Sequence, residues 1–446
     1  MSHAGKPPSA FQSELTVAFV DYPHLIEDFL DNIGVGFESF WRERTGSWIF
    51  DYVASLQHAG VRSVLFSFSA RVKAPWHFTH ELSGMKVCVL PATRTYVALR
   101  RRLLNPYATT VERAFCDHDL HGAKRTMYEV LRNVAPYLTT PLRSLAREIR
   151  RERCDAILCQ DYEHARFDAC VLLGQCLRLP VVASFQGGDW QYSKIERPLR
   201  PLALRRSSGL IVGPRVEVNR LQSQYGAALP RLGRIFNPID MEAWYPDRRD
   251  ETRTQLGIPR GAQTIAWHGR VEIEKKGLDV LLEVWEKLSK TEPKNRELRL
   301  LLIGSGGDAA RMQRHIDDRG LQGIIWINEF VRDRHRLRQL LSAADVYAFS
   351  SRYEGFPLAP VEAMACGLPV VATDVQGVAD IFENGELSGG LVVPSEDARA
   401  FALALNRILE DDTWRRELGS RARYRAETAF GRPAIGRQLR DFIFGQ

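Results

Sequence analysis

The amino-acid sequence predicts an α/β protein with two doubly wound, mainly parallel sheets, one in each half of the chain. Short apolar, β-branched runs alternate with helical stretches along both halves, which is the pattern of consecutive βαβ units. The chain has 446 residues, a length that suits two or three domains that each bury a core of their own. The fold class follows from this alternation and this length together.

The composition is that of an ordinary globular protein, with 45% apolar and 26% charged residues. No apolar run approaches the ~20 residues that cross a bilayer, and the first eight residues lack the apolar core of a signal peptide. The seven cysteines form no C-x-x-C pair, which indicates free, mostly buried thiols in a reducing compartment. We therefore expect a cytoplasmic location.

The net charge of +7 is concentrated in one segment. Residues 94–153 contain thirteen Lys and Arg against six Asp and Glu, an excess of seven. A basic segment of this kind can bind an anionic membrane surface, a lipid-phosphate acceptor or nucleic acid. An ordinary solvated helix face explains it equally well. Among the functional alternatives we expect peripheral contact with the inner face of an anionic membrane, and no nucleic acid.

The first half, residues 1–236, is expected to contain six strands. They are Leu15–Val20, Ser63–Phe68, Lys86–Leu90, Asp155–Cys159, Pro180–Phe185 and Gly209–Gly213. Helices are expected over Phe40–Ala59, over the amphipathic stretch Pro141–Arg151 and near 165–178. Gly34 and Gly36 follow the first strand, where glycine lets the backbone approach a ligand and where a plain turn gives the same pattern.

The second half, residues 237–429, is expected to contain five further strands. They are Thr264–His268, Arg299–Ile303, Ile324–Ile327, Val346–Phe349 and Val370–Thr373. A last helical stretch, Ala434–Ile443, falls in the final segment, residues 430–446.

The stretch Ser350–Gly367 joins the last two of these strands through a helix of about two turns. Gly367 suits the end of that helix and Pro360 suits its first turn. A helix N-terminus favours phosphate, but Glu354 and Glu362 bracket this one and would repel it. Their carboxylates are better suited to hydroxyl groups. A phosphate flanked by hydroxyls describes a nucleotide sugar.

The pattern E-G-F-P-L-x-x-x-E-A-M-A-C-G-x-P-V-V-A-T in this stretch strongly resembles the retaining family-4 glycosyltransferases of the GT-B fold, also called glycosyl transferases group 1. The resemblance implies two Rossmann-like domains that face each other across a cleft, with residues 430–446 forming a helix that packs back on the first domain. It also implies a hexosyltransferase-type enzyme of polysaccharide biosynthesis. Such an enzyme moves a sugar from a nucleoside-diphosphate sugar to a hydroxyl acceptor, with retention and without a metal or other cofactor.

By this resemblance Glu354 holds sugar hydroxyls and Glu362 holds the ribose. Backbone N–H groups of the same motif would donate hydrogen bonds to the phosphates. Its prolines cannot donate, because they have no N–H. The donors are Gly355, Phe356, Leu358 and Ala359, and the prolines are Pro357 and Pro360.

A second motif, His268–Leu281, supplies the cations that such a reaction needs. A strand ends at Gly269, and Arg270 and Lys276 follow before a helix begins. Fixed cations that neutralise a leaving diphosphate lower the barrier by about 3 kcal/mol each. Arginine grips oxygens as a planar fork and lysine acts as a point charge. The family pattern G-R-x-x-x-x-K-G has one residue fewer, so Lys276 is preferred to Lys275 because Gly277 follows it.

Further positions border the expected site. Gly304 opens a glycine-rich turn that lacks the third glycine of a dinucleotide fingerprint and is expected to edge the nucleotide cleft. Gln186 stands where the family usually has histidine. Glutamine cannot take a proton at neutral pH, so Gln186 is expected to orient the sugar or a backbone turn. Asp189 is expected to touch the acceptor, and the resemblance places the Gly34–Gly36 loop beside the acceptor and the donor phosphates.

Several alternatives remain open. Cys116–His121 contains potential metal ligands and a D-x-D, but no second cluster completes a site, and we expect a polar loop. A nucleotide-sugar epimerase or a phosphorylase is a competing enzyme class. A nucleotide-sugar-binding protein without transferase activity is the non-enzymatic alternative, motivated by Gln186. The acceptor can be a glycan, a lipid-linked sugar or a small molecule.

Overall fold

The computed structural model describes residues 15–21, 24–33, 36–38, 40, 48–81, 83–106, 108, 110–117, 119–186, 194–291 and 297–445. The chain divides into two compact units. The first unit comprises Met1–Val212, Leu221–Ile235 and Gly436–Gln446, and the second comprises Gly213–Arg220 and Phe236–Ile435. These units are compact regions of the chain, and they do not test where its domains begin and end. The expected domain limits 1–236, 237–429 and 430–446 therefore stay predictions.

The first unit is built on an eight-stranded sheet in the order β3-β4-β2-β1-β5-β6-β7-β8. Neighbouring strands are parallel, except that β3 and β4 are antiparallel. The strands are β1 (Thr16–Val20), β2 (Arg62–Ser69), β3 (Trp76–Thr79), β4 (Lys86–Pro91), β5 (Ala156–Gln160), β6 (Val181–Ser184), β7 (Gly209–Ile211) and β8 (Leu232–Gly233). The sequence did not predict β3 or β8, because β3 is a mostly exposed edge strand and β8 has only two residues.

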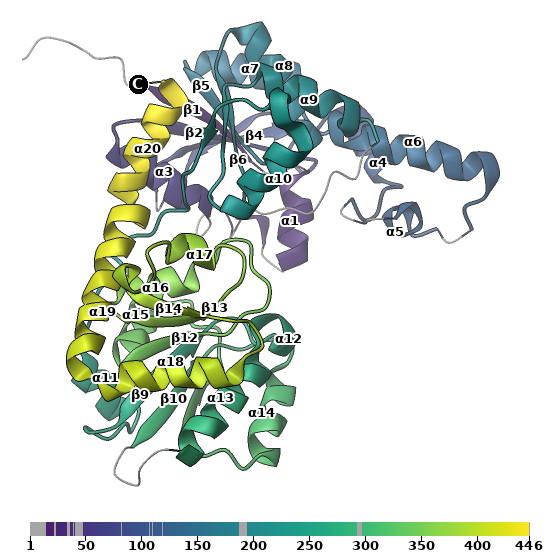
Figure 1. Cartoon of the computed structure of the whole chain (residues 1–446). Coiled ribbons are helices and arrows are strands. Elements are labelled where there is room, and N and C mark those ends of the chain that lie inside the picture. Colours follow the sequence, from purple (N-terminus) through teal and green to yellow (C-terminus); the bar gives the residue numbers. More distant parts are fainter. Residues whose placement is uncertain are drawn as a thin grey trace, which may run out of the picture. The chain divides into compact units, whose positions relative to one another are not determined.

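Helices cover this sheet, and one pair extends away from it. The helices are α1 (Ile26–Ile33), α3 (Trp48–His58), α4 (Arg94–Arg100), α5 (Val111–Phe115), α6 (Gly122–Leu138), α7 (Leu142–Arg151), α8 (Ala165–Leu177), α9 (Glu196–Arg206) and α10 (Arg215–Tyr225), whose first turns belong to the second unit. The helix expected over Phe40–Ala59 appears as α3, and residues 41–47 lie outside the described residues. Figure 1 shows α6 projecting from the sheet with α5 beside it.

The C-terminal helix α20 (Arg432–Phe444) completes the first unit from Gly436 onward. The ring of Phe442 lies so close to Gly209 and Gly233 that a Cβ on either glycine would come within 2.8 Å of it. A Cβ on Gly436 would lie 1.9 Å from the carbonyl oxygen of Ser55 in α3. The helix therefore meets β7, β8 and α3 at positions where only glycine leaves enough room.

The second unit is built on a six-stranded, wholly parallel sheet in the order β11-β10-β9-β12-β13-β14. The strands are β9 (Gln263–His268), β10 (Leu298–Ile303), β11 (Ile324–Ile327), β12 (Val346–Phe349), β13 (Val370–Thr373) and β14 (Gly390–Val393). The five strands expected from the sequence are present. The sixth, β14, extends the sheet at the edge next to β13.

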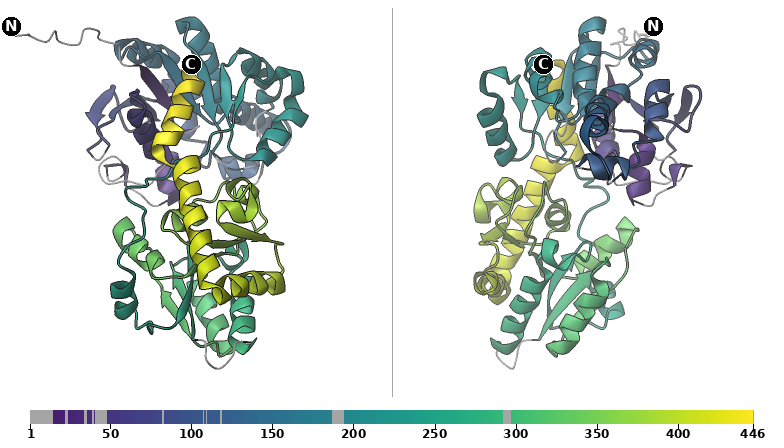
Figure 2. Two further views of the ribbon diagram at one scale, coloured as in Figure 1. Left: turned by 60° about the vertical axis from the view of Figure 1, so that its left-hand side comes forward. Right: turned by 90° about the vertical axis from the view of Figure 1, so that its right-hand side faces the viewer.

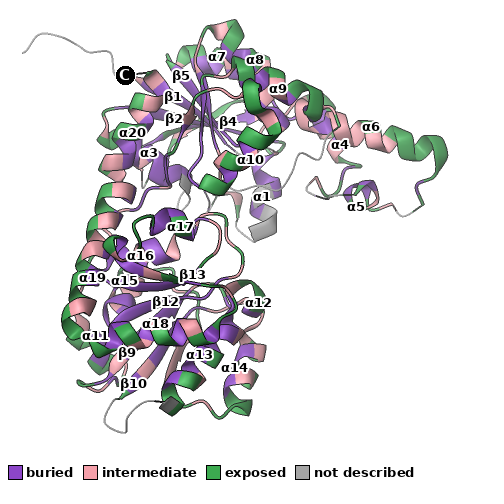
Figure 3. Ribbon diagram, viewed as in Figure 1, coloured by how far each residue is buried: buried purple, intermediate pink, exposed green. Residues whose placement is uncertain are grey.

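Helices lie on both faces of this second sheet (Figure 2). They are α11 (Arg249–Gln255), α12 (Ile273–Lys276), α13 (Leu278–Thr291), α14 (Ala309–Asp318), α15 (Arg334–Ser342), α16 (Ala359–Ala365), α17 (Val378–Ile381), α18 (Ala398–Glu410) and α19 (Asp412–Arg425). α13 and α18 cover one face through a core that includes Trp267, Trp285 and Leu405. Figure 3 shows the buried strands beneath helices whose outer faces are exposed. Two doubly wound, mainly parallel sheets are thus confirmed.

Two further properties bear on the cellular setting. The cysteines are free thiols, five of them buried and two, Cys116 and Cys176, exposed. Within the described ranges, no helix is both long and apolar enough to cross a membrane.

Candidate functional site

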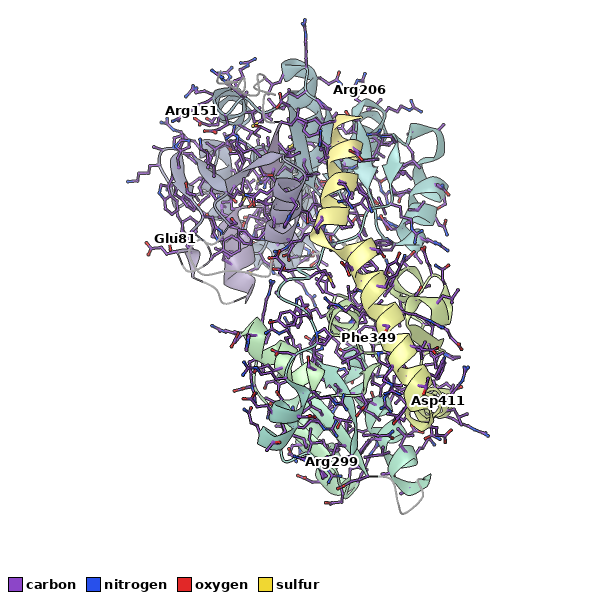
Figure 4. The ribbon with its side chains drawn as sticks, turned by 90° about the vertical axis from the view of Figure 1, so that its left-hand side faces the viewer. Glu81, Arg151, Arg206, Arg299, Phe349 and Asp411 are labelled. Atoms are coloured by element: carbon purple, nitrogen blue, oxygen red, sulfur yellow. The ribbon has the colours of Figure 1, made fainter. Side chains whose placement is uncertain are left out.

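The candidate site lies where β9, β10 and β12 of the second unit end. In Figure 4, Arg299 near the start of β10 and Phe349 at the end of β12 mark the two ends of this sheet. Ligands of open parallel sheets bind beyond the carboxyl ends of the strands. The predicted residues Gly269 and Gly304 and the motif after Phe349 all follow those ends.

Two glycines let the loops after β9 and β10 touch. A Cβ on Gly304 would lie 1.9 Å from the carbonyl oxygen of Gly269, and Gly304 has φ of 138°. The N–H of Gly269 donates to the carbonyl oxygen of Ile303 at 3.0 Å. Gly304 is therefore needed for a close backbone approach, and it aligns the start of the loop that carries Arg270.

The glycine-rich turn after β10 also supports that loop further along. The N–H of Val271 donates to the carbonyl oxygen of Ser305 at 3.1 Å, and a Cβ on Gly306 would lie 2.4 Å from the carbonyl oxygen of Val271. The carboxylate of Asp308 accepts from the N–H of Ile273 at 2.9 Å, at the start of α12. The turn thus holds the Arg270 loop in place.

The structure brings Lys276 and Glu354 together. Lys276 Nζ lies 2.6 Å from Glu354 Oε1, and the two side chains are 20% and 13% exposed. The Ser350 hydroxyl donates to the carbonyl oxygen of Lys276 at 2.8 Å, and a Cβ on Gly277 would lie 2.0 Å from the Ser350 carbonyl oxygen. Lys275 is more exposed, with Nζ 3.9 Å from Glu272. The geometry therefore distinguishes Lys276 from its neighbour.

Glu362 has a partner that the sequence reasoning missed. His268, the last residue of β9, places Nε2 2.9 Å from Glu362 Oε2 in the first turn of α16. The Tyr347 hydroxyl donates to the His268 carbonyl oxygen at 3.3 Å, and burial raises the pKa of Tyr347 well above its usual value. The signal was available, because His268 immediately precedes Gly269 in the same motif. The imidazole fixes one carboxylate oxygen of Glu362.

Arg270 belongs to neither of these two pairs. Its side chain is 69% exposed and pairs with Glu272 at 3.2 Å. Among the residues that the structure describes, no hydrogen bond or ion pair joins Arg270 to Glu354. Its guanidinium is thus available to a ligand.

The motif loop is anchored by an aromatic cluster. The ring of Phe356 stacks on Phe236 at 5.2 Å between centroids and lies 6.0 Å from Phe430. A Cβ on Gly377 would lie 3.0 Å from both the Gly355 carbonyl oxygen and Pro357 Cδ. These contacts fix the backbone between Glu354 and α16, which begins after Leu358 as the motif predicted.

Arg352 ties this loop to the helices after β9 and was not singled out in the sequence. Its guanidinium donates to both carboxylate oxygens of Asp279 at 2.7 and 2.9 Å and pairs with Glu396. Its backbone N–H donates to the Lys275 carbonyl oxygen at 2.9 Å. Hydrogen bonds to Glu396 and Asp279 raise the pKa of Arg352 further. A bidentate clamp of this kind fixes both distance and orientation, here between the segments of Lys276 and Glu354.

The predicted residues of the first unit are only partly placed. Gly34 and Asp189 lie outside the described residues. Gly36 is exposed, and its carbonyl oxygen accepts from the N–H of Phe40 at 2.9 Å. Gln186 Nε2 donates to the Ser184 hydroxyl at 2.6 Å, and the Gln186 N–H donates to the Asp161 carboxylate at 3.1 Å.

The carboxyl edge of the first sheet also buries charges that the sequence reasoning did not select. The Arg166 guanidinium is buried and donates to the carbonyl oxygens of Asp21 at 2.6 Å and His24 at 2.9 Å. Burial raises the pKa of Asp21 to about 7, against the Ser67 hydrogen bond and the Arg166 charge. Burial lowers the pKa of His24 and of His164 to about 3. Both imidazoles are therefore neutral at physiological pH.

Comparison with known proteins finds a family match within the second unit. Residues 248–425 match the family described as "Glycosyl transferases group 1". The chain is 33% identical over 204 residues to the D-inositol 3-phosphate glycosyltransferase of Saccharomonospora viridis, covering 45% of this chain and 47% of that one. The enzyme of the same name from Corynebacterium diphtheriae is 30% identical over 238 residues, with 52% and 55% covered. The chain thus spans about half the length of these curated relatives.

Solved structures resemble the chain over nearly its whole length. Sucrose-phosphate synthase from Thermosynechococcus elongatus has a TM-score of 0.61 at 20% identity, covering 97% of this chain and 98% of that one. Anabaena Alr3699/HepE in complex with UDP has a TM-score of 0.65 at 17% identity, covering 97% and 100%. These likenesses show the fold, which is that of the GT-B glycosyltransferases.

Proposed function

We propose that the protein transfers a sugar from a nucleoside-diphosphate sugar to a hydroxyl acceptor with retention at the anomeric carbon. The ion pair between Lys276 and Glu354 is the observation that carries this proposal. It joins the cation of one predicted motif to the carboxylate of the other, inside the segment that matches glycosyl transferases group 1. Three other observations support it, namely the His268–Glu362 pair, the GT-B fold and the UDP complex of a structural neighbour.

In the proposed donor complex each charged group has a separate task. Glu354 accepts hydrogen bonds from sugar hydroxyls, and Glu362, held by His268, accepts from the ribose. Lys276 donates to the diphosphate while it stays close to Glu354, because an ammonium has three donors. Arg270 turns its exposed guanidinium onto the same phosphates. The two cations stabilise the charge that develops on the leaving group, which is where preorganised electrostatics lowers a barrier most.

The proposed transfer needs no basic side chain at Gln186. The bond between the anomeric carbon and the phosphate oxygen breaks, and the acceptor oxygen bonds to the same face of the sugar. The acceptor proton passes to the leaving diphosphate. Gln186, whose amide donates to Ser184, has an orienting role in this scheme.

A donor screen tests the proposal. We expect a UDP-, GDP- or ADP-sugar to raise the melting temperature of the full chain, because binding to the native state stabilises it. The same donor should then lose its sugar to an acceptor or to water, also in the presence of a chelator. Tight donor binding without turnover would instead favour a binding protein, and an interconverted or phosphorolysed donor would favour the epimerase or phosphorylase alternative.

We also propose that the basic segment 94–153 contacts an anionic membrane at the cytoplasmic face. Helix α6 has 17 residues and, apart from Ala135, no buried side chain, and it exposes Met127 and Val130, as the nearby segment exposes Leu104. Apolar side chains among basic ones suit an anionic lipid surface. Vesicles with anionic lipid should sediment the protein more than neutral vesicles, and equal sedimentation would refute the contact.

A further inference from the structure

Three side chains with metal-binding atoms meet at the β3–β4 edge of the first unit. They are His77 on β3, Cys88 on β4 and Glu148 on α7, and their ligand atoms all lie within 4.8 Å of one another. His77 and Cys88 are directly opposed in the antiparallel β3–β4 pair, so both side chains leave the same face of the sheet. α7 supplies the third group to that face.

The cluster combines buried ligands with an entry from solvent. Cys88 and Glu148 are buried, whereas the His77 side chain is 34% exposed. His77 Nε2 lies 2.9 Å from Glu148 Oε2. Arg151 Nη1 lies 3.5 Å from the same oxygen, but the Arg151 side chain is largely exposed and can turn into solvent. An ion can therefore reach the two buried ligands past the imidazole.

The three groups suit Zn²⁺ in chemistry and charge. Zinc binds Cys sulfur at about 2.3 Å, His nitrogen at about 2.0–2.1 Å and carboxylate oxygen at about 2.0–2.2 Å. Tetrahedral bonds of these lengths place ligand atoms about 3.5 Å apart, so shifts of about 1 Å are enough. A thiolate and a carboxylate carry two negative charges, which one Zn²⁺ neutralises. Buried charges are tolerated when they coordinate a metal.

We propose that His77, Cys88 and Glu148 bind one Zn²⁺ ion, with water in the fourth position. On binding, the Cys88 proton leaves to solvent and a sulfur–zinc bond forms, without any change in oxidation state. The ion joins the edge strand β3 to α7. It belongs to the first unit and is independent of the proposed sugar transfer.

Cobalt titration of the full chain tests the site. The protein is stripped with a chelator and titrated with Co²⁺, whose thiolate complexes absorb in the near ultraviolet, and Zn²⁺ is then added. We expect one Co²⁺ per chain, an absorption band that Zn²⁺ abolishes, and a higher melting temperature with Zn²⁺. Cys88→Ser should lose the band and bind Zn²⁺ more than about 100-fold more weakly, because loss of outer partners alone costs about 10–100-fold.

Two further variants keep the test decisive. Cys116→Ser is the matched control, because Cys116 is an exposed thiol on another segment, and it should keep the band. His77→Ala changes a partly exposed residue of an edge strand, so it should fold normally by circular dichroism and still lose affinity for Zn²⁺. A band that is absent from the wild type, persists in Cys88→Ser or disappears in Cys116→Ser would overturn the proposal.

Discussion

The carboxyl edges of the two sheets handle charge in different ways. In the second unit Lys276 meets Glu354 and His268 meets Glu362, side chain to side chain, with three of the four carrying appreciable exposure. In the first unit the buried Arg166 donates instead to the backbone carbonyl oxygens of Asp21 and His24. Side-chain pairs near solvent can exchange partners with a ligand, whereas a guanidinium bonded to backbone holds the fold. The first arrangement suits a binding site, and the second suits a scaffold.

The largest expected effect concerns the pair of Lys276 and Glu354, which can exchange partners with a ligand. Lys276→Ala should lower kcat by about 10²–10³, the loss typical of one preorganised donor to a developing negative charge. Lys275→Ala is the matched control and should keep turnover close to wild type, because Lys275 is the more exposed lysine and lies 3.9 Å from Glu272. Steady-state rates with a saturating donor distinguish the two. Equal rates for both variants would remove Lys276 from the proposed site.

A second prediction concerns the close backbone contact between Gly304 and Gly269. Gly304→Ala places a Cβ 1.9 Å from the Gly269 carbonyl oxygen at φ of 138°, so we expect a loss of at least about 3 kcal/mol in the free energy of unfolding. Gly307→Ala is the control, because nothing lies within 4 Å of its added Cβ. Urea unfolding measures both. A Gly304 variant as stable as the control would show that the loops after β9 and β10 need no such close approach.

A third prediction concerns the carboxyl edge of the first sheet, where the dependence of stability on pH reports on the buried Asp21. The pKa of Asp21 is raised to about 7 by burial, so between about pH 4 and pH 7 the folded chain holds a proton that the unfolded chain has lost. Stability therefore falls as pH rises through this window. Asp21→Asn cannot titrate, so wild type should lose stability relative to this variant by on the order of 2 kcal/mol or more between pH 4 and 7.

The histidines near Asp21 have the opposite effect. Their lowered pKa makes stability fall as pH drops from about 6.5 toward 3, and this contribution is common to wild type and Asp21→Asn. Only the difference between the two unfolding free energies is therefore diagnostic. A difference that stays constant from pH 4 to 7 would show that Asp21 is ionised throughout.

The smallest expected effect is at Gln186. Its amide holds the Ser184 hydroxyl, so Gln186→Ala should lower turnover by about tenfold or less, the loss of about one hydrogen bond. The pH profile of kcat should be unchanged, because glutamine carries no titrating proton. Loss of all activity would instead assign Gln186 an indispensable catalytic role.

The second unit was largely predictable from sequence because its elements carry local signals. Two of its apolar strands, β9 and β10, end directly before Gly269 and Gly304, and α16 begins and ends where Pro360 and Gly367 indicate. The pairs themselves join residues far apart in the chain, such as Lys276 with Glu354 and His268 with Glu362. The resemblance placed three of these four residues in one site. His268 was missed although it opens the second motif, because its pairing with Glu362 depends on the tertiary fold.

The first unit was harder to predict because its distinctive features arise from tertiary packing. β3 is a mostly exposed edge strand without an apolar run, and β8 has two residues. Arg166 appears in the sequence as one arginine among many, and only burial beneath Asp21 and His24 reveals its role. The cluster of His77, Cys88 and Glu148 likewise depends on strand pairing that no local pattern encodes.

The first unit contains segments from both ends of the given sequence, and this arrangement has a consequence for its biosynthesis. Residues 236–435 are synthesised before Gly436–Gln446, which at about 5–20 residues per second takes on the order of 10–40 s. Until then Gly209 and Gly233 lack the Phe442 ring that covers them. The N-terminal sheet must therefore wait on the ribosome with an uncovered surface while the second unit is translated.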